Sequence, residues 1–368
     1  MVKALLWVLL LWMCTDAAVS SRDAAAILVL GVRGSEYRLN KLKKGSGWVL
    51  SSVRLDLEKL RPPPAMWITT NNGYDFAVSR DGREAMLVLY SQTGNRTSHP
   101  LLVAAEISTG HTRLVAELPY FNYPHIQACP MKVAVDENGD VLVGSLHYLQ
   151  PSNMEGPTQF GFVRANPSNG ATVILPPLTT MDVSTNSGSM LLSEQGAFGP
   201  GGIYCDNWYK LSQPRKFHRL VCFDIHSGQV VANSSNHEQL YDFAHDTTTG
   251  TFIGLALCCD DGSSDCPPEC KGHNNQRTLA SWTAIGSAPP RIKALLNVTQ
   301  LGSTYVTLGR ALDSTSRAFT YVSVHVRNGV VNGYELVDLD VDTGSITGRT
   351  NYTDVVALGT LFRFAYMP

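Results

Sequence analysis

Residues 221–231 read VCFDIHSGQVV: a short apolar strand, a polar turn that ends in Gly228, and a second apolar strand. The same pattern returns three times, as AEISTGHTRLV at 105–115, VRANPSNGATVI at 163–174 and VDLDVDTGSIT at 337–347. The turn glycines are separated by steps of 60, 58 and 116 residues, and the last step is twice 58. Glycine suits these turns because a tight hairpin needs a positive φ angle. The spacing predicts a structural unit that repeats about every 58 residues.

Two further copies are expected from this period, around Gly286 in SWTAIGSAPPRI (281–292) and around Gly45 and Gly47 in YRLNKLKKGSGWVL (37–50). A second set of turns alternates with the first. Its members are FAVSRDGREAMLVLY (76–90), KVAVDENGDVLVGSL (132–146), FAHDTTTGTFIGLAL (243–257) and LGRALDSTSRAFTYV (308–322). Each unit therefore contains two hairpins, or four strands. Six units of four antiparallel strands predict an all-β fold, a six-bladed β-propeller, whereas a β-sandwich has no reason to repeat at this spacing.

The two ends of the chain complement each other. The C-terminal stretch 353–368 reads like the inner part of a blade without its outer part, and residues 27–53 read like an outer part without an inner strand. We expect the N- and C-terminal strands to share one blade, which closes the ring and removes its open edges. Residues 21–368 are then one propeller domain.

The tetrapeptide YDFA occurs twice, at 74–77 and at 241–244. The copies are 167 residues apart, or about three repeats, so they should begin inner strands that face each other across the axis. A weaker third copy is Tyr352-Thr353-Asp354-Val355. Asp75, Asp242 and Asp354 are therefore predicted near one mouth of the channel, where carboxylates can hold Ca²⁺. The alternative is structural, with each Asp accepting hydrogen bonds from backbone N–H groups and joining blade to blade.

The first twenty residues predict export. Lys3 precedes an apolar run over 4–14 that is too short to span a bilayer comfortably, and small residues follow it, so residues 1–20 are predicted to be a signal peptide. No later stretch is apolar enough for a membrane anchor. Four N-x-S/T sequons indicate a secreted glycoprotein; their asparagines are Asn95, Asn233, Asn297 and Asn351. The formal net charge is −2 and basic residues are scattered, which argues against nucleic acid as a partner.

The cysteines fit an oxidising compartment. Cys205 and Cys222 flank one loop and are expected to form a cross-strand disulfide if their strands pair. Four others cluster in CCDDGSSDCPPEC, predicted to join the second and third strands of a blade; they are Cys258, Cys259, Cys266 and Cys270. Two local disulfides are the expectation for this cluster, and a zinc site is the alternative. Cys129 is left unpaired, either as a buried small side chain or as a thiol nucleophile beside His125.

Two aromatic stretches border predicted inner strands or strand ends. The residues are Tyr120, Phe121, Tyr123 and His125 in LPYFNYPHIQ, with Trp208 and Tyr209 in IYCDNWYK. Loops at the ends of inner strands form the binding face of a propeller, and exposed rings there suit a sugar, a flat ligand or a protein. The alternative is that these rings pack between blades.

The phrase VAVDENGDVLVG (133–144) resembles secreted six-bladed propellers of the NHL, strictosidine-synthase-like and SMP-30/lactonase type. The resemblance covers the blade rhythm, and it implies a Ca²⁺-dependent lactonase or arylesterase as one function. We expect instead that the propeller face binds an extracellular protein, glycan or small ligand without catalysis. A Ca²⁺-dependent hydrolase with a metal at the channel mouth is the second hypothesis, and a structural matrix glycoprotein is the third.

Overall fold

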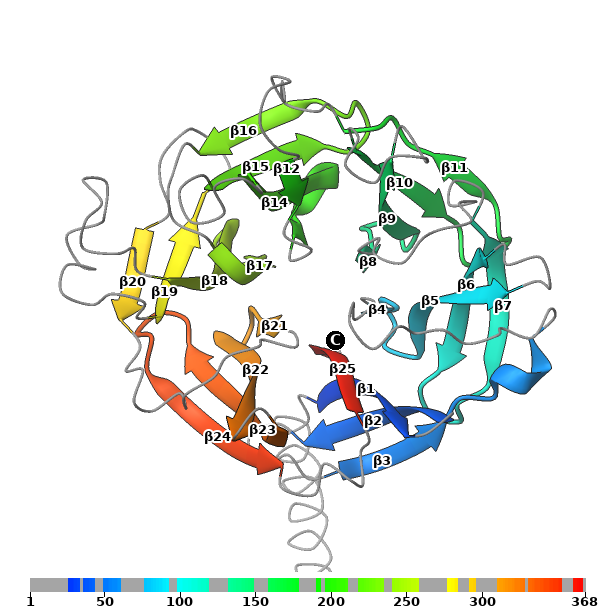
Figure 1. Ribbon diagram of the computed structural model, residues 1–368, viewed down its shortest axis with the longest axis horizontal. Helices are drawn as coiled ribbons and strands as arrows, with labels where there is room; N and C mark the ends of the chain where they lie inside the picture. Colours follow the sequence, from blue (N-terminus) through cyan, green and yellow to red (C-terminus); the bar gives the residue numbers. More distant parts are fainter. Residues whose placement is uncertain are drawn as a thin grey trace, which may run out of the picture.

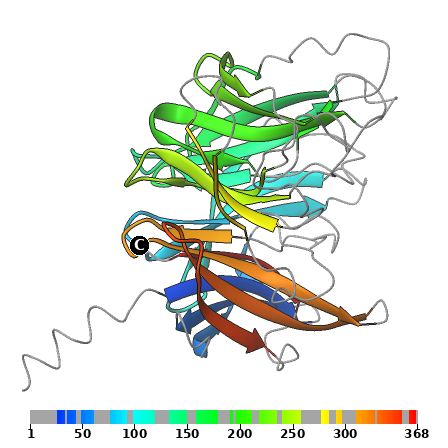
Figure 2. The ribbon, with the colours of Figure 1, turned by 90° about the vertical axis from the view of Figure 1, so that its left-hand side faces the viewer.

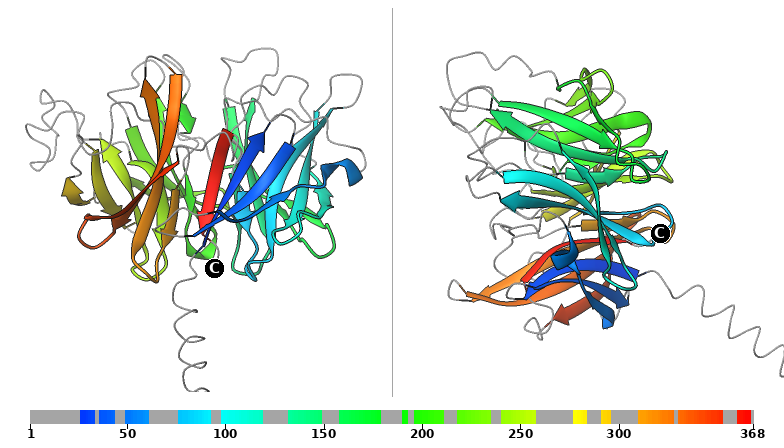
Figure 3. Two further views of the ribbon diagram at one scale, coloured as in Figure 1. Left: turned by 90° about the horizontal axis from the view of Figure 1, so that it is seen from below. Right: turned by 90° about the vertical axis from the view of Figure 1, so that its right-hand side faces the viewer.

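The computed structural model describes residues 26–33, 36–43, 49–60, 76–92, 98–118, 132–148, 158–178, 190–192, 196–210, 218–234, 240–257, 277–283, 291–295, 310–327, 330–352 and 360–366. These residues form six antiparallel sheets arranged as blades around a central axis (Figure 1). The all-β, six-bladed propeller expected from the repeat is therefore confirmed. Figures 2 and 3 show the ring from its edge, with strands running between its two faces.

Blades 1 to 3 each contain four strands, which follow one another from the axis outward. Blade 1 consists of β25 (Thr360–Tyr366), β1 (Ala26–Arg33), β2 (Glu36–Lys43) and β3 (Val49–Arg54). Blade 2 consists of β4 (Phe76–Val78), β5 (Glu84–Gln92), β6 (Ser98–Glu106) and β7 (Thr112–Glu117). Blade 3 consists of β8 (Lys132–Val135), β9 (Val141–Tyr148), β10 (Thr158–Ala165) and β11 (Thr172–Ile174).

Blades 4 to 6 complete the ring. Blade 4 consists of β12 (Met190–Leu192), β13 (Ala197–Phe198), β14 (Ile203–Lys210), β15 (His218–Asp224) and β16 (Val230–Ser234). Blade 5 consists of β17 (Leu240–Asp246), β18 (Thr251–Leu257), β19 (Arg277–Trp282) and β20 (Arg291–Leu295). Blade 6 consists of β21 (Arg310–Asp313), β22 (Ala318–Arg327), β23 (Val330–Asp340) and β24 (Ile346–Tyr352). Among the described residues, two 3-10 turns, at Leu57–Lys59 and Pro200–Gly202, accompany the strands.

The termini close the ring as predicted. The last strand, β25, is the innermost strand of blade 1 and pairs antiparallel with β1, from Ile27 opposite Tyr366 to Val32 opposite Thr360. Because β25 comes from the C-terminus and β1 to β3 come from the N-terminus, the backbone hydrogen bonds of this blade tie the two ends of the chain together.

Blade 4 departs from the expected four strands. Its inner strand is divided into β12 and β13, and both pieces pair with β14. Leu192 lies opposite Trp208 and Ala197 lies opposite Cys205, so the inner chain has two more residues than its partner between these pairs. The interruption distinguishes the inner wall of blade 4 from the other described inner strands.

The glycine turns that fixed the repeat have the predicted geometry. The turns between third and fourth strands end in glycines with φ angles of 76° or 71°; these are Gly110, Gly170, Gly228 and Gly344. In each turn the glycine N–H donates to the carbonyl four residues before it, as Gly228 does to Asp224. The expected copies around Gly45, Gly47 and Gly286 lie outside the described residues.

The same glycines also make room for the preceding blade. A Cβ atom on Gly228 would lie 2.2 Å from the carbonyl oxygen of Pro177, which follows the outer strand of blade 3. On Gly110 it would lie 2.0 Å from the carbonyl oxygen of Arg54, and on Gly170 it would lie 2.5 Å from that of Val115. Glycine is therefore required at these positions for two reasons: the positive φ angle and the close packing of the neighbouring blade.

The outer strands carry a feature that the sequence did not reveal. In five blades the pairing of the fourth strand with the third shifts by one residue, which is a β-bulge. The extra residues are Leu50, Val115, Val231, Lys293 and Thr347. Bulges disturb the hydrogen-bonding edge of a sheet, so this device protects the rim of the ring from pairing with other chains.

The core lies between the blades rather than within them. Apolar side chains from facing blades form common clusters, for example Leu39 of β2 with Leu87 of β5, and Phe162 of β10 with Tyr204 of β14. Further clusters join blades 2 and 3, blades 4 and 5, and blades 5 and 6. Because blades 2 to 5 each bury both faces against their neighbours, these blades depend on the ring for their stability.

The inner strands share one residue at a matched position. In blades 2 to 6 an alanine lies on the inner strand, two residues before the residue at which the turn to the second strand starts. These alanines are Ala77, Ala134, Ala197, Ala244 and Ala311. In blade 1 the pair Phe364-Ala365 of β25 repeats the Phe-Ala pair of YDFA. Neighbouring inner strands contact each other around the axis. A small side chain suits a position where neighbouring inner strands contact each other, which gives a reason for the alanine of the repeated tetrapeptide.

Candidate functional site

The ring has two different faces. The turn face carries the short turns between first and second strands, at 79–83, 136–140, 199–202, 247–250 and 314–317. The connection face is the opposite face, where each inner strand begins and each second strand ends. Every connection from one blade to the next inner strand therefore arrives at the connection face, which is the face where propellers place their binding loops.

YDFA begins inner strands in opposite blades, as predicted. The first copy leads into β4 of blade 2, and the second lies in β17 of blade 5 (Figure 1). Asp75 directly precedes β4 and lies outside the described residues. Asp242 lies in β17 at a bulge, because Tyr241 pairs with Leu255 whereas Ala244 pairs with Ile253. The bulge places Asp242 and Phe243 together opposite Gly254.

The third copy of YDFA does not begin an inner strand. Tyr352 is the last residue of β24, the outer strand of blade 6, and the next inner strand begins at Thr360. The likeness to YDFA therefore does not extend to the place of Tyr352 in its strand, and the position of Asp354 near the channel mouth stays a prediction. Asp354 itself lies outside the described residues.

The predicted aromatic residues are divided between the segment that joins blades 2 and 3 and the strand β14 of blade 4. Tyr120, Phe121, Tyr123 and His125 lie between β7 and β8, outside the described residues, as does Cys129. Trp208 and Tyr209 lie in β14, where their backbones pair with Leu192 and Leu191 of β12. This places them near the end of a second strand and beside the interrupted inner strand of blade 4.

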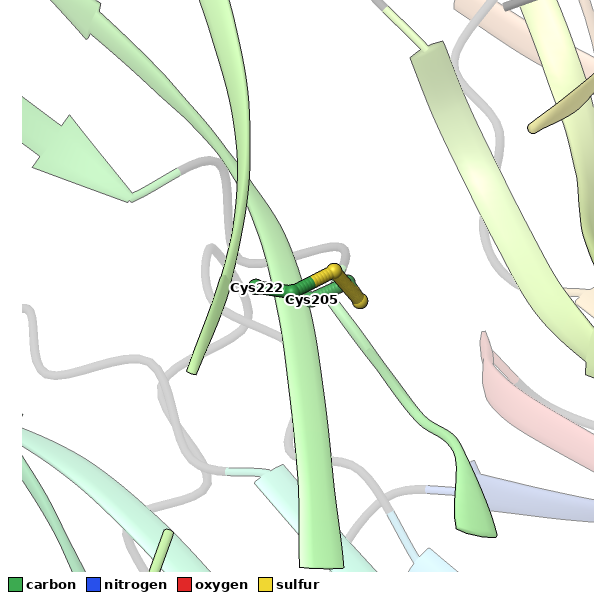
Figure 4. Close-up of a disulfide and its surroundings, with 2 residues drawn as sticks. All are labelled: Cys205 and Cys222. Atoms are coloured by element: carbon green, nitrogen blue, oxygen red, sulfur yellow. A yellow bond between two sulfur atoms is a disulfide. The ribbon is translucent and has the colours of Figure 1, made fainter. Parts of the chain in front are cut away.

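The predicted disulfide between Cys205 and Cys222 is present. The two residues lie directly opposite each other on β14 and β15, with a Cα–Cα distance of 4.0 Å, and both are fully buried (Figure 4). They pack in the cluster that joins blade 4 to blade 5. Cys258, Cys259, Cys266 and Cys270 lie between β18 and β19, the second and third strands of blade 5, outside the described residues.

Two of the four sequon asparagines lie on outer strands. Asn233 lies in β16 with a half-buried side chain, and Asn351 lies in β24. Asn95 and Asn297 lie outside the described residues, as does the predicted signal peptide at 1–20. Among the described residues, no helix is long and apolar enough to cross a membrane, and no group of three His, Cys, Asp or Glu residues is gathered as for a metal ion.

Sequence reasoning missed the basic residues on the inner strands. Lys132 begins β8, Arg310 begins β21, and Arg363 lies in β25. Lys132 is buried, with an exposed fraction of 4%. The four turn sequences of the second set could have shown two of these residues if they had been aligned on their common alanine. Lys132 would then have aligned with Asp75 and Asp242 of YDFA, and Arg310 with Phe76 and Phe243.

A buried acid of blade 4 was also missed. Asp206 of β14 is fully buried, and its carboxylate accepts a hydrogen bond of 2.6 Å from the Tyr204 hydroxyl. Tyr204 packs among Phe160, Phe162 and Phe198 at the interface of blades 3 and 4. Gly196 is adjacent, since a Cβ atom there would lie 2.1 Å from the Tyr204 hydroxyl oxygen. This glycine lets the interrupted inner strand approach the Tyr204–Asp206 pair.

The turn face is occupied by interactions that hold the blades together. Asp246, at the end of β17, is fully buried and forms an ion pair with Arg317 of blade 6, which also pairs with Asp342 at 2.8 Å. Burial alone would raise the pKa of Asp246, but hydrogen bonds from Thr249, Arg317 and the Thr248 N–H outweigh it and lower the pKa to about 2.

Arg317 stands where other blades have glycine. Its φ angle is 55°, and it is the only non-glycine residue with positive φ in the part of the chain that the structure describes. The left-handed conformation costs an ordinary residue about 1 kcal/mol, and the two ion pairs of Arg317 offset this cost. These contacts explain why the expected glycine is absent from the first turn of blade 6.

Comparison with known proteins shows the fold alone. No family model matches the chain, and no curated protein matches it. The chain is similar to a candidate TolB protein from Agrobacterium tumefaciens, with 10% identity over 88% of this chain and 87% of that chain and a TM-score of 0.45. It is similar to a candidate 6-phosphogluconolactonase from Bacteroides uniformis, with 11% identity over 94% of this chain and 99% of that chain and a TM-score of 0.45.

A third similar structure is a puromycin hydrolase, with 13% identity and a TM-score of 0.50. The match covers 88% of this chain but 43% of the hydrolase chain. At such low identities these proteins share an architecture with this chain and carry no argument about its activity. The resemblance to the NHL, strictosidine-synthase-like and SMP-30/lactonase type is therefore supported only as a propeller.

Proposed function

We propose that this protein is a secreted glycoprotein that recognises a protein, glycan or small ligand at its connection face. The contrast between the two faces carries the proposal. The turn face consists of short turns whose side chains bond to their own turns or to the next blade, as Asp246 does with Arg317. The connection face receives all the blade-to-blade connections.

Four of the six connections between blades are long, which adds to the argument. The stretches 61–75, 119–131, 179–189 and 296–309 each join an outer strand or 3-10 turn to the next inner strand. They hold 15, 13, 11 and 14 residues, far more than the short turns at the other ends of the same inner strands. Long connections on a rigid scaffold are where binding residues are concentrated. The aromatic residues Tyr120, Phe121 and Tyr123 fall in one of them.

The experiment places a glycan at either end of β17. Glu238→Thr completes a sequon with Asn236 just before this inner strand, at the connection face. Thr247→Asn completes a sequon with Thr249 in the exposed turn just after it, at the turn face. The purified secreted protein and both variants are applied to a glycan microarray and to an array of extracellular proteins. Each added glycan is verified by a mass shift that an N-glycosidase removes.

We expect the array signal of the unmodified protein to be lost in Glu238→Thr and retained in Thr247→Asn. Loss in Thr247→Asn alone would move the binding site to the turn face and contradict the proposal. A second assay measures hydrolysis of lactones and aryl esters with and without Ca²⁺. If hydrolysis requires Ca²⁺ and the protein binds nothing on either array, the proposed recognition function is wrong and a Ca²⁺-dependent hydrolase takes its place.

A further inference from the structure

One histidine lies in the contact between blades 4 and 5. His245 belongs to β17, the inner strand of blade 5, where it pairs with Phe252 of β18. Its ring packs edge-on against the Phe252 ring, with 5.2 Å between the centroids. Blade 4 adjoins both rings, since a Cβ atom on Gly199 would lie 3.6 Å from Cδ2 of His245 and 3.0 Å from Cζ of Phe252. We call this contact of His245, Phe252 and Gly199 the histidine joint.

The blade 4 side of the histidine joint is held by few strand pairs. It is formed by the end of β13, which has two residues and is one half of the divided inner strand. The next four residues, at 199–202, include three glycines, and Gly201 and Gly202 have φ angles of 66° and 76°. Short elements with few contacts open more readily than long ones. Contact between β13 and β17 therefore matters for the position of this segment.

The His245 ring is placed to remain neutral. The side chain is half-buried, and its Nε2 atom is buried without a hydrogen-bond partner among the described residues. A neutral ring leaves Nε2 as an unused acceptor, which is a modest loss. A protonated ring would carry a hydrogen and a positive charge there, and burying an unpaired charge is far more costly. Protonation therefore favours a state in which water reaches Nε2.

The charged groups around the histidine joint do not compensate for this burial. The negative group that acts on the ring is Asp246, the next residue of β17, but its carboxylate is paired with Arg317 of blade 6. The described residues of β13, of β18 and of the 3-10 turn Pro200–Gly202 contain no charged side chain.

The neighbouring turn of blade 4 carries two titratable groups, and both are engaged elsewhere. The Asp224 carboxylate accepts hydrogen bonds from the Ser227 hydroxyl and the His226 N–H. The His226 side chain is exposed to solvent. No charged group from this turn is therefore available to stabilise a protonated His245.

These surroundings fix the direction of the pH effect. Burial lowers the pKa of His245 from its ordinary value of 6.5, and it outweighs the charge of Asp246 and a hydrogen bond with the Gly250 backbone, which both raise the pKa. When the joint is open the ring regains its ordinary pKa, so below pH 6.5 the open state binds a proton that the closed state does not. Closure is therefore fully favoured above pH 6.5 and weakens as the pH falls below it.

We propose that the histidine joint is an acid-sensitive contact, closed while His245 is neutral and opened when His245 is protonated. Opening moves β13 and the segment 199–202 away from β17 and brings Nε2 into water. The change is local, because the sheets of blades 1 to 3 have no part in this contact. The inference goes beyond the proposed recognition at the connection face and does not depend on it.

The test is hydrogen–deuterium exchange of the full secreted protein at pH 7.5 and pH 5.5, corrected for the intrinsic pH dependence of amide exchange. Two amides report on the joint: the Gly199 N–H donates to the Ile203 carbonyl, and the Ile225 N–H donates to the Gly202 carbonyl. The turn at 166–170 in blade 3 serves as the internal control.

Three variants identify the responsible group. His245→Phe keeps a ring of similar shape that cannot be protonated, and His245→Asn is a second neutral variant in case the first fails to fold. His226→Gln is the matched control, because it removes the exposed histidine of the adjacent turn. A measurement on the wild-type protein alone gives the pKa of His245, from the pH dependence of hydrogen exchange at the ring carbon between its two nitrogens.

We expect corrected exchange at 199–203 to rise severalfold, up to about tenfold, between pH 7.5 and pH 5.5 in the wild-type protein, since pH 5.5 is one unit below 6.5. The rise should persist in His226→Gln and be absent from both His245 variants and from residues 166–170. The His245 ring should titrate below pH 6.5.

Four results would overturn the inference. They are a ring pKa of 6.5 or higher, an unchanged exchange rate in the wild-type protein, an equal rise in all variants, and a rise of equal size at 166–170. The last would mean that acid unfolds the whole ring rather than the histidine joint.

Discussion

Replacing Gly228 by alanine tests whether neighbouring blades really require glycine in the repeated turn. Gly228 has a φ angle of 71°, and a Cβ atom there would lie 2.2 Å from the Pro177 carbonyl oxygen of the preceding blade. Gly250 is the matched control, because its φ angle is 68° but no atom lies within 4 Å of its Cβ position. The two substitutions therefore share the backbone strain and differ only in the contact.

The expected magnitudes follow from this difference. Left-handed backbone costs alanine about 1 kcal/mol relative to glycine, so Gly250→Ala should lose about that much stability. In Gly228→Ala the two blades must also move apart by about 1 Å, and overpacking of this kind typically costs a further ~1 to 3 kcal/mol. We expect Gly228→Ala to be destabilised by about 3 kcal/mol in total.

The assay is urea unfolding of the secreted protein, followed by tryptophan fluorescence, with the midpoint and slope compared between variants. Gly110→Ala and Gly170→Ala extend the series, since their Cβ atoms would lie 2.0 and 2.5 Å from the preceding blade. The loss should follow the order Gly110, Gly228, Gly170. Equal losses in Gly228→Ala and Gly250→Ala would refute the reasoning, because the contact between blades would then contribute nothing.

Three further outcomes are expected. The double variant Cys205→Ala/Cys222→Ala should lose about 3 kcal/mol in urea unfolding, because the disulfide closes a loop with a separation of 17 residues. Asp246, whose pKa is lowered to about 2, should contribute about 2 kcal/mol to the free energy of unfolding above pH 4 and lose this contribution as the pH falls toward 2. In Asp246→Asn the free energy of unfolding should therefore fall less steeply between pH 4 and pH 2. Arg317→Gly should destabilise the wild-type protein, because it leaves the Asp246 carboxylate buried without its cation, yet it should be neutral or stabilising when Asp246 is already Asn. A loss of equal size in both backgrounds would show that Arg317 does not act through Asp246.

The acid dependence has a definite sign. A carboxyl group whose pKa is lowered in the folded protein binds its proton more readily after unfolding, so acid favours the unfolded chain. The model-peptide value for Asp246 is 3.8, and the folded value is about 2. The contribution of Asp246 is complete above pH 3.8 and disappears below about pH 2. An unfolding free energy that does not change between these pH values would contradict the lowered pKa of Asp246.

Part of the candidate site could be predicted from the sequence. The two copies of YDFA gave the opposite blades correctly, because a spacing of 167 residues is an arithmetic consequence of the repeat. Cys205 and Cys222 were paired correctly because their strands form a hairpin around a single loop. The third copy differs from the other two, since Tyr352 ends an outer strand and residue similarity alone does not distinguish that place from the start of an inner strand.

The placing of two basic residues on neighbouring inner strands required the strand register. Arg310 and Arg363 lie in segments that share no obvious motif, and 53 positions separate them in the sequence. Only the pairing of β21 with β22 and of β25 with β1 brings them to neighbouring inner strands. Likewise, the buried pair Tyr204–Asp206 was read as part of an aromatic strand end, because burial between two blades leaves no local signature.

The sequence by itself determined the number of blades, the glycine turns and the sharing of blade 1 by the two termini. These features are local and periodic. A turn such as that at Gly228 needs a residue that tolerates positive φ wherever the turn occurs, and the number of repeats then gives the number of blades. Only the tertiary structure decided the bulges of the outer strands, the divided inner strand of blade 4 and the replacement of a turn glycine by Arg317. Each of these depends on a neighbouring strand or blade, and contacts between residues far apart in the chain appear only when the ring has closed.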